Sequence, residues 1–233
     1  LSGANTISIL KKLEEQSEDP RLRVLIRCYQ GLEDPSVTTE RLFALHDFQS
    51  FLQSDSAGRF YFPEKTILNY HTALQTKPFV IMTGLSGTGK TKLAQLYAKF
   101  MTGQDEAGDR YEVIAVRPDW MDNKGLLGFY NLLTERYQST PFLDIILRAL
   151  KNPSRRYYVI LDEMNLAKVE YYFSDFLSAM ESKEELELHS LEGEAIKAGA
   201  DTDVDYVAVP NRVRVPENLF FTGTVNVDET TYM

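Results

Sequence analysis

The sequence of 233 residues contains a single cysteine, Cys28, and only three histidines. One cysteine cannot form an internal disulfide or a cysteine-rich zinc site, and His46, His71 and His189 lack the spacing of metal ligands. This scarcity indicates an intracellular, cytoplasmic protein. No apolar run approaches the roughly 18 residues that span a bilayer, and the first residues lack the basic-then-apolar order of a signal peptide. We therefore expect no membrane partner. Because the sequence does not begin with Met, a fragment or an excised segment is expected.

The sequence also lacks an excess of positive charge. Its formal net charge is −9, and residues 181–205 contain nine acidic residues against Lys183 and Lys197. Nine minus two leaves −7 in this segment, so the rest of the chain is close to neutral. A protein that coats nucleic acid needs a basic surface, so direct nucleic-acid binding is not expected. The acidic segment is expected to be solvated.

Two hydrophobic patterns divide the chain. Residues 1–58 space apolar residues three and four apart, which predicts a helical N-terminal segment with no recognisable chemistry. From residue 59 onward, short apolar runs alternate with amphipathic stretches, which predicts buried parallel strands joined by helices. We therefore expect an α/β domain over residues 59–233, folded as a three-layer αβα sandwich with a central parallel sheet.

A glycine-rich loop follows the apolar run FVIMT. It reads GLSGTGKT and fits the pattern G-x-x-x-x-G-K-[ST] of a phosphate-binding loop. Glycines let backbone N–H groups turn toward a phosphate, and the helix that starts near Lys90 adds its positive end. Lys90 would contact the β- and γ-phosphates, and the Thr91 hydroxyl would bind Mg²⁺. The predicted nucleotide-binding residues are Gly84, Leu85, Ser86, Gly87, Thr88, Gly89, Lys90, Thr91 and Lys92.

Two further apolar runs end in polar residues. YYVIL is followed by Asp162 and Glu163, and LFFTGTV is followed by Asn226. Ligands bind at the carboxyl ends of the strands in open α/β folds, so these side chains would lie beside the glycine-rich loop. Asp162 is predicted to hold Mg²⁺ with Thr91, and Glu163 to be the general base that activates water. Asn226 would orient that water; a simple turn former is the alternative.

The order of loop, acidic pair and strand-end asparagine resembles Walker A, Walker B and sensor 1 of AAA+ ATPases, which have the P-loop NTPase fold. The stretches LDEMNLAKVEYYFSDFLSAME and VPENLFFTGTVN resemble the matching parts of McrB-type and dynein-related AAA+ proteins. That branch inserts a β-hairpin before sensor 1, at residues 184–209 here, and further elements around residues 120–131. Both insertions commonly face the pore of a ring. The resemblance thus implies a homo-oligomeric ring, a hexamer, in the full-length protein.

The resemblance also has limits. The family's arginine finger and C-terminal lid should follow Met233, so residues 59–233 are expected to be a truncated AAA+ core. McrB-type GTPases carry M-N-T-x-D-R at sensor 1, whereas this chain reads VNVDET and lacks the arginine. GTP specificity is therefore not implied, and ATP with Mg²⁺ is preferred over GTP. Arg155 and Arg156 precede the second apolar run and receive no role.

The function implied by the resemblance is an AAA+ ATP hydrolase that drives a partner. The motor subunit of a McrBC-like restriction or defence system, with a McrC-like nuclease subunit, is the specific hypothesis. A GTP-specific McrB-type GTPase and a non-catalytic, nucleotide-gated scaffold are the alternatives. Glu163 speaks against the scaffold, because degenerate modules often lose that acid. A small-molecule kinase is a weaker alternative, because no substrate-binding lid motif is present.

Overall fold

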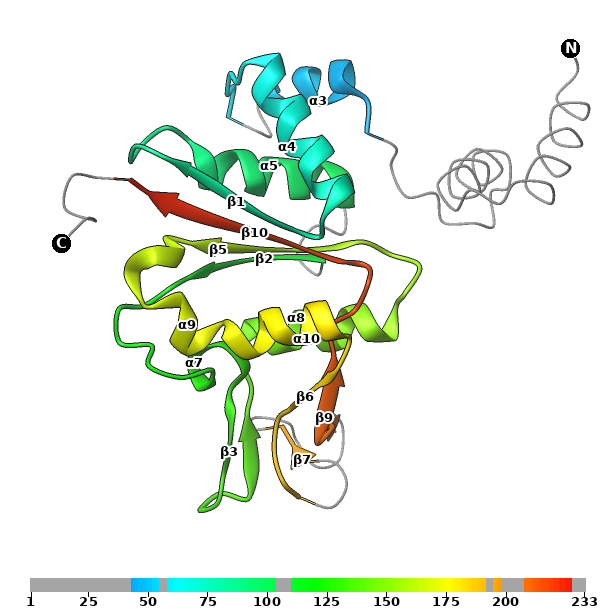
Figure 1. The fold of residues 1–233 in the computed structure, drawn as a ribbon. Coiled ribbons are helices and arrows are strands. Elements are labelled where there is room, and N and C mark those ends of the chain that lie inside the picture. The colour runs from blue at the N-terminus through cyan, green and yellow to red at the C-terminus, as the bar shows by residue number, and fades with distance from the viewer. Residues whose placement is uncertain (1–42, 55–57, 104–109, 192–194, 198–207, 228–233) are drawn as a thin grey trace, which may run out of the picture. The chain divides into compact units, whose positions relative to one another are not determined.

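The computed structural model describes residues 43–54, 58–103, 110–191, 195–197 and 208–227 (Figure 1). All of them fall within the compact unit Leu42–Met233. Of the predicted helical segment, residues 1–42 lie outside the described part. The described remainder contains helix α3, Leu45–Leu52. Its aromatic residues pack into the same core cluster as Phe100 of the helix that follows the glycine-rich loop.

The central sheet has four strands in the order β1-β10-β5-β2, and every neighbouring pair is parallel. The strands are β1, Phe79–Gly84; β10, Leu219–Asn226; β5, Tyr157–Asp162; and β2, Tyr111–Ala115. Gly84 pairs with Asn226, and Ala115 pairs with Asp162. The register therefore brings the ends of the three predicted functional strands to one edge of the sheet, as the sequence predicted.

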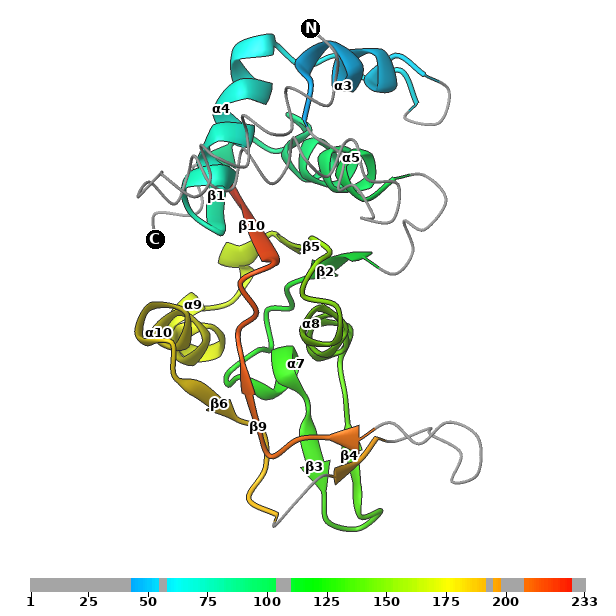
Figure 2. The same cartoon turned by 90° about the vertical axis from the view of Figure 1, so that its right-hand side faces the viewer.

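Helices cover both faces of this sheet (Figures 1 and 2). One face is covered by α3, α4 (Glu64–Thr76) and α5 (Lys90–Thr102). The other face is covered by α8 (Pro141–Lys151) and α10 (Ser174–Ser182). The strand β5 alternates between the two layers, because successive side chains of a strand point to opposite faces. Tyr158 and Ile160 pack with the first group of helices, and Val159 and Leu161 with the second. The predicted αβα sandwich is confirmed.

Short antiparallel pairs extend from the second layer. The β3–β4 hairpin pairs Phe129–Asn131 with Arg136–Gln138 and follows the short helix α7, Lys124–Leu127. Two strands of the acidic region pair with strands that follow it: β6, Glu185–Glu187, with β9, Arg212–Arg214, and β7, Ala195–Ile196, with β8, Ala208–Val209. The described part of residues 184–209 is thus built from antiparallel β structure, in agreement with the expected hairpin insertion, although its outer pair reaches beyond residue 209.

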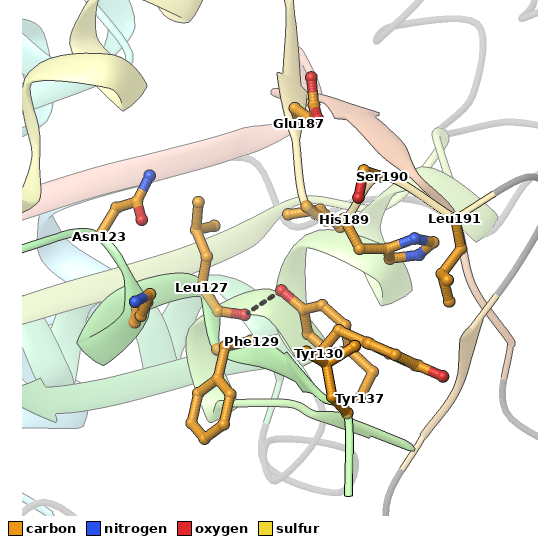
Figure 3. Close-up of a pocket in the computed structure, with 13 residues that line it drawn as sticks. Asn123, Leu127, Phe129, Tyr130, Tyr137, Glu187, His189, Ser190 and Leu191 are labelled. Atoms are coloured by element: carbon orange, nitrogen blue, oxygen red, sulfur yellow. Dashed lines mark hydrogen bonds between the residues drawn. The ribbon is translucent and has the colours of Figure 1, made fainter. Parts of the chain in front are cut away.

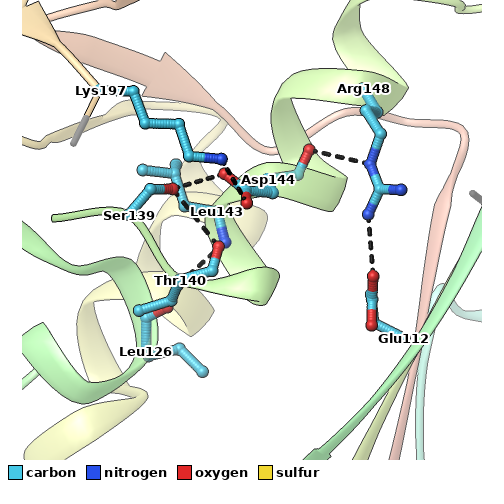
Figure 4. Close-up of polar contacts among 8 residues, drawn as sticks. All are labelled: Glu112, Leu126, Ser139, Thr140, Leu143, Asp144, Arg148 and Lys197. Carbon is cyan, nitrogen blue, oxygen red and sulfur yellow. Dashed lines mark hydrogen bonds and ion pairs between the residues drawn. The ribbon is translucent and has the colours of Figure 1, made fainter. Parts of the chain in front are cut away.

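Helix α8 anchors these insertions to the sheet (Figure 4). The Thr140 hydroxyl caps the helix by accepting from Leu143 N at 3.2 Å, and it also donates to the Leu126 carbonyl of α7. One turn in, Asp144 forms an ion pair with Lys197 at 2.7 Å, at the end of β7. Arg148 then pairs with Glu112 of β2 at 3.0 Å. One helix therefore connects the sheet, the segment before the β3–β4 hairpin and the acidic insertion.

Gly128 joins α7 to the β3–β4 hairpin, and its replacement by alanine is expected to be strongly destabilising. Its φ is +89° and its ψ is −167°, and an added Cβ would lie 2.0 Å from the Gln138 carbonyl oxygen. Backbone strain and the clash with fixed backbone together should cost about 3 to 4 kcal/mol in the free energy of unfolding. Urea denaturation followed by circular dichroism measures this cost.

Gly103 offers a matched control. It has a similar backbone conformation, with φ +83° and ψ 159°, but an added Cβ there would meet no atom of the described residues within 4 Å. The Gly103→Ala change should therefore cost only the strain, about 1 to 2 kcal/mol. Equal losses for the two variants would show that the contact with Gln138 does not constrain the hairpin.

Candidate nucleotide-binding site

The glycine-rich loop runs from the end of β1 to the first residue of α5. Gly87 and Gly89 have positive φ angles of 77° and 83°, so the loop uses backbone conformations that other residues rarely adopt. Lys90 opens α5, and its Nζ donates to the Gly84 carbonyl at 2.9 Å and the Leu85 carbonyl at 2.7 Å. The ammonium group is therefore held inside the curve of the loop rather than extended into solvent.

The other loop residues divide into exposed and supporting ones. Leu85 and Ser86 are exposed at the turn, and the Thr88 hydroxyl donates to the Leu85 carbonyl at 2.9 Å. Lys92 was also predicted to bind nucleotide, but its side chain contacts residues outside the loop. Its Nζ lies 3.4 Å from the Gln95 side chain and 5.3 Å from the centre of the Phe60 ring.

Thr91 and Asp162 meet at the sheet edge. The Thr91 hydroxyl donates to Asp162 Oδ1 at 2.5 Å, although 71 residues separate them in the sequence. A third group, the Thr224 hydroxyl of β10, donates to the same carboxylate oxygen at 2.9 Å. Two hydroxyl groups and a carboxylate thus form one oxygen cluster at the N-terminal end of α5.

Glu163 and Asn226 form the second half of the site. The Asn226 amide nitrogen donates to Glu163 Oε1 at 2.8 Å, while its amide oxygen accepts from Lys90 Nζ at 2.8 Å. Asn226 therefore bridges the loop lysine and the carboxylate. Glu163 has φ 53° and ψ 51°, a left-handed conformation that is uncommon for a residue other than glycine. This turn directs the chain away from β5 immediately after Asp162.

Sequence reasoning missed two residues that support this arrangement. Thr224 holds Asp162, and its hydroxyl also accepts from the backbone nitrogen of Glu163 at 3.1 Å. Asn165 donates from its amide to the backbone oxygen of Asn226 at 3.2 Å. The alternation of Thr222, Thr224 and Asn226 along β10 was a usable signal, because residues two apart share one face of a strand.

Replacing Thr224 with valine is expected to raise the Mg²⁺ concentration needed for half-maximal nucleotide binding about tenfold, because the variant removes a hydrogen bond that orients Asp162. Nucleotide binding at a series of Mg²⁺ concentrations measures this shift. The control is Thr222→Val on the same face of the same strand, where the hydroxyl bonds the buried Tyr70 phenol at 2.7 Å. Both changes should cost about 1 to 2 kcal/mol of stability. If Thr222→Val changed the Mg²⁺ dependence equally, the effect would come from general destabilisation.

The oxygen cluster suits a cation that takes only a few of its ligands from the protein. Within the described residues, no three His, Cys, Asp or Glu side chains gather as an all-protein metal site. Thr91 and Asp162 instead offer two adjacent oxygen ligands. Mg²⁺ typically takes one or two protein ligands and completes its octahedron with water and substrate phosphates. The donor set therefore fits Mg²⁺ bound together with a nucleotide.

Comparison with known proteins identifies the family. Residues 79–220 match the AAA domain family (dynein-related subfamily). The chain belongs to this family. The AAA-domain match runs from β1 into the start of β10 and includes the glycine-rich loop, Asp162 and Glu163, while Asn226 follows it. AAA+ proteins in general use a nucleotide and Mg²⁺, which agrees with the donor set at this site.

A relative of this AAA domain is the EcoKMcrB subunit of the type IV methyl-directed restriction enzyme of Escherichia coli strain K12. The two are 25% identical over 182 residues, which is 76% of this chain and 37% of that protein. The chain thus spans well under half the length of its curated relative. Among solved structures, a closed-state cryo-EM reconstruction of Hsp104:ATPyS and FITC casein aligns over 80% of this chain and 31% of that chain, with 17% identity and a TM-score of 0.38.

In the described ranges, no helix has the length and apolar character needed to cross a bilayer.

Proposed function

We propose that this AAA domain binds ATP together with Mg²⁺ and hydrolyses its γ-phosphate bond to drive a partner protein. The observation that carries the proposal is the position of Asn226, which hydrogen-bonds both Lys90 and Glu163. A phosphate-binding lysine and a candidate general base are thereby held within reach of one polar side chain. In the proposed reaction, water attacks the γ-phosphorus in line with the bond to the leaving ADP.

The proposed roles follow from the geometry. Lys90 and the backbone amides of residues 84–92 bind the phosphates, since Lys90 already lies within the curve of the loop. Glu163 accepts a proton from the attacking water, and Asn226 fixes the orientation of both the water and the Glu163 carboxylate. Positive charge near the γ-phosphate stabilises the transition state, in which charge lies on the phosphoryl oxygens.

Thr91 and Asp162 would hold Mg²⁺, directly or through water. When bound, Mg²⁺ supplies charge that neutralises the phosphate oxygens. Thr224 keeps the Asp162 carboxylate turned toward Thr91 by donating to the oxygen that Thr91 also contacts. Lys92 and the exposed Leu85 and Ser86 complete the proposed binding loop, the last two through backbone amides.

Residues 59–233 are proposed to be an AAA+ core that acts in a homo-oligomeric ring, a hexamer. The similarity to the EcoKMcrB subunit favours the motor subunit of a McrBC-like restriction or defence system, with a McrC-like nuclease subunit as the partner. ATP is proposed over GTP, because VNVDET lacks the arginine that follows sensor 1 in McrB-type GTPases. Residues from 228 onward in this stretch lie outside the described part of the chain.

Phosphate release tests the proposed function. The chain is incubated with Mg²⁺ and ATP or GTP over a hundredfold range of protein concentration, and free phosphate is measured. ATP should be the better substrate. We propose that an arginine of a neighbouring subunit, expected beyond Met233, completes the site, so the activity per subunit should rise with protein concentration only for a chain extended past Met233. The same assay is run on a chain extended past Met233 to include the proposed arginine finger and C-terminal lid. Failure to release phosphate from either protein at any concentration would overturn the proposal.

A further inference from the structure

The backbone at Glu163 adopts a conformation that its surroundings must hold in place. Glu163 has φ 53° and ψ 51°, and the residues that follow it, Met164–Leu166, form a single 3₁₀ turn. A left-handed residue other than glycine costs free energy and persists only where surrounding contacts fix it. The contacts that fix residues 163–166, the Glu163 turn, therefore set the position of the Glu163 carboxylate.

Tyr172 fixes the Glu163 turn from one side. Its hydroxyl donates to the Met164 carbonyl at 2.8 Å, and both residues are only 1% exposed. Burial raises the pKa of the Tyr172 phenol above its usual value, so the hydroxyl keeps the proton that it donates. From the other side, the Glu163 backbone nitrogen donates to the Thr224 hydroxyl at 3.1 Å. The two hydrogen bonds thus hold the backbone immediately before and after the Glu163–Met164 peptide.

Trp120 packs against the ring of Tyr172. Their ring centres lie 5.3 Å apart and their planes are inclined at 67°, an edge-to-face arrangement that is favourable for aromatic pairs. The indole lies against Gly125 of α7, where an added Cβ would come within 2.6 Å of Trp120 Nε1. Trp120 therefore lies between α7 and the helix α9, Val169–Tyr172, which ends at the tyrosine.

The segment that contains Trp120 is joined to the neighbouring helices and is also open to solvent. Asn123 Nδ2 donates to Asp175 Oδ2, in the first turn of α10, at 3.0 Å. Met121, next to Trp120, is 79% exposed. An exposed part of the insertion at residues 120–131 is thus in contact with the same helical region that holds the Glu163 turn.

We propose that Tyr172 is a positioning residue for Glu163, and that Trp120, packed on its ring, links the Glu163 turn to the insertion at residues 120–131. This inference rests on the proposed function, in which Glu163 accepts a proton from the attacking water. Tyr172 acts through the backbone rather than on the substrate: it fixes the turn from which the carboxylate extends. A small misplacement of a catalytic group lowers the rate strongly, so this support contributes to kcat.

The Glu163 turn should respond to bound nucleotide, because Asn226 connects it to the phosphate-binding lysine. Lys90 Nζ donates to Asn226 Oδ1 at 2.8 Å, and Asn226 Nδ2 donates to Glu163 Oε1 at 2.8 Å. Phosphates that attract Lys90 change the first bond, and Asn226 passes the change to Glu163. The ring of Tyr172 moves with the turn to which its hydroxyl is bonded, so the surroundings of the indole of Trp120 change as well.

Replacing Tyr172 with phenylalanine tests the positioning role, since the change removes the hydroxyl and leaves the buried ring. In the chain extended past Met233, kcat for phosphate release should fall about tenfold, while the Kd for ATPγS stays within about twofold of that of the parent. The matched control is Tyr137→Phe, because Tyr137 is also fully buried and its hydroxyl donates to a backbone carbonyl, that of Leu127, at 3.2 Å (Figure 3). An unchanged kcat in Tyr172→Phe, or an equal loss in Tyr137→Phe, would overturn the role.

A double variant separates positioning from general destabilisation. Tyr172→Phe is combined with Glu163→Gln, and hydrolysis is followed in single turnovers. A residue that acts only through Glu163 should add at most about a twofold loss once the carboxylate has been removed. A further loss of about tenfold would show that Tyr172 acts elsewhere, and would overturn the proposal.

Trp120 is the single tryptophan among the 233 residues, so its fluorescence reports the link without a label. As ATPγS is added to this chain with Mg²⁺, the emission should change with the same midpoint as binding measured by calorimetry. The Tyr172→Phe variant should bind ATPγS and lose that change. If the parent bound no ATPγS, the proposed function would fail, and this inference with it. Binding with unchanged emission in the parent, or with an equal change in Tyr172→Phe, would leave the proposed function standing and overturn the link.

Discussion

Replacing Lys90 with alanine is expected to weaken the binding of ATPγS in the presence of Mg²⁺ by about 100-fold, because the variant loses charge-assisted hydrogen bonds to the phosphates. The Nζ atom lies 2.7 to 2.9 Å from the Gly84 and Leu85 carbonyls and the Asn226 amide oxygen, inside the curve where the phosphates are proposed to lie. Fluorescence anisotropy of a labelled ATP analogue measures the change in Kd.

The control for this variant is Lys151→Ala. Lys151 is an exposed lysine in the last turn of α8, so its removal changes the net charge equally without touching the glycine-rich loop. Its affinity for nucleotide should stay within about twofold of the parent, since isolated surface charges contribute little. If both lysine variants bound nucleotide as the parent does, the glycine-rich loop would not be the phosphate site.

Replacing Glu163 with glutamine is expected to lower kcat for nucleotide hydrolysis by about 100- to 10,000-fold, the usual contribution of a general base. Nucleotide affinity should stay within about threefold, because an amide has the same shape as the carboxylate and its oxygen can still accept from Asn226 at the 2.8 Å observed. Phosphate release and nucleotide binding are measured on the same preparation. A loss of kcat with retained binding separates a catalytic role from a structural one.

Glu170→Gln serves as the matched control. Glu170 is an exposed acid in the first turn of helix α9, Val169–Tyr172, and it carries the same charge as Glu163 a short distance along the chain. Its hydrolysis rate should equal that of the parent. A Glu163→Gln protein that hydrolyses nucleotide as fast as the parent would instead support the non-catalytic, nucleotide-gated scaffold.

The polar residues that follow the apolar runs allowed the position of the site to be predicted. Buried parallel strands deliver whatever follows them to one edge of the sheet, so Asp162 and Asn226 could be placed beside the loop from the sequence alone. The order of strands was not predictable in this way. The register that pairs Gly84 with Asn226, and so brings Asn226 to Lys90, depends on β10 inserting between β1 and β5.

Other features depend on tertiary contacts that leave little trace in a sequence. Thr224 looks like an ordinary strand residue, and its role appears only when Asp162 lies 2.9 Å away. The stretch VEYYFSDFLSAMES is helical except for a break at Phe173: α9 ends at Tyr172 and α10 begins at Ser174. Tyr172 and Phe173 are both fully buried, and adjacent helical positions point about 100° apart, so a break lets both side chains enter the core.

Isothermal titration of the chain with ATPγS and with GTPγS, each in the presence of Mg²⁺, tests the central claim most directly. The account predicts saturable binding of one nucleotide per chain, stronger for ATPγS than for GTPγS, and loss of that binding when Mg²⁺ is removed with EDTA. Preference for GTPγS would correct the base specificity and leave the phosphate site intact. Absence of binding by both nucleotides would contradict the account.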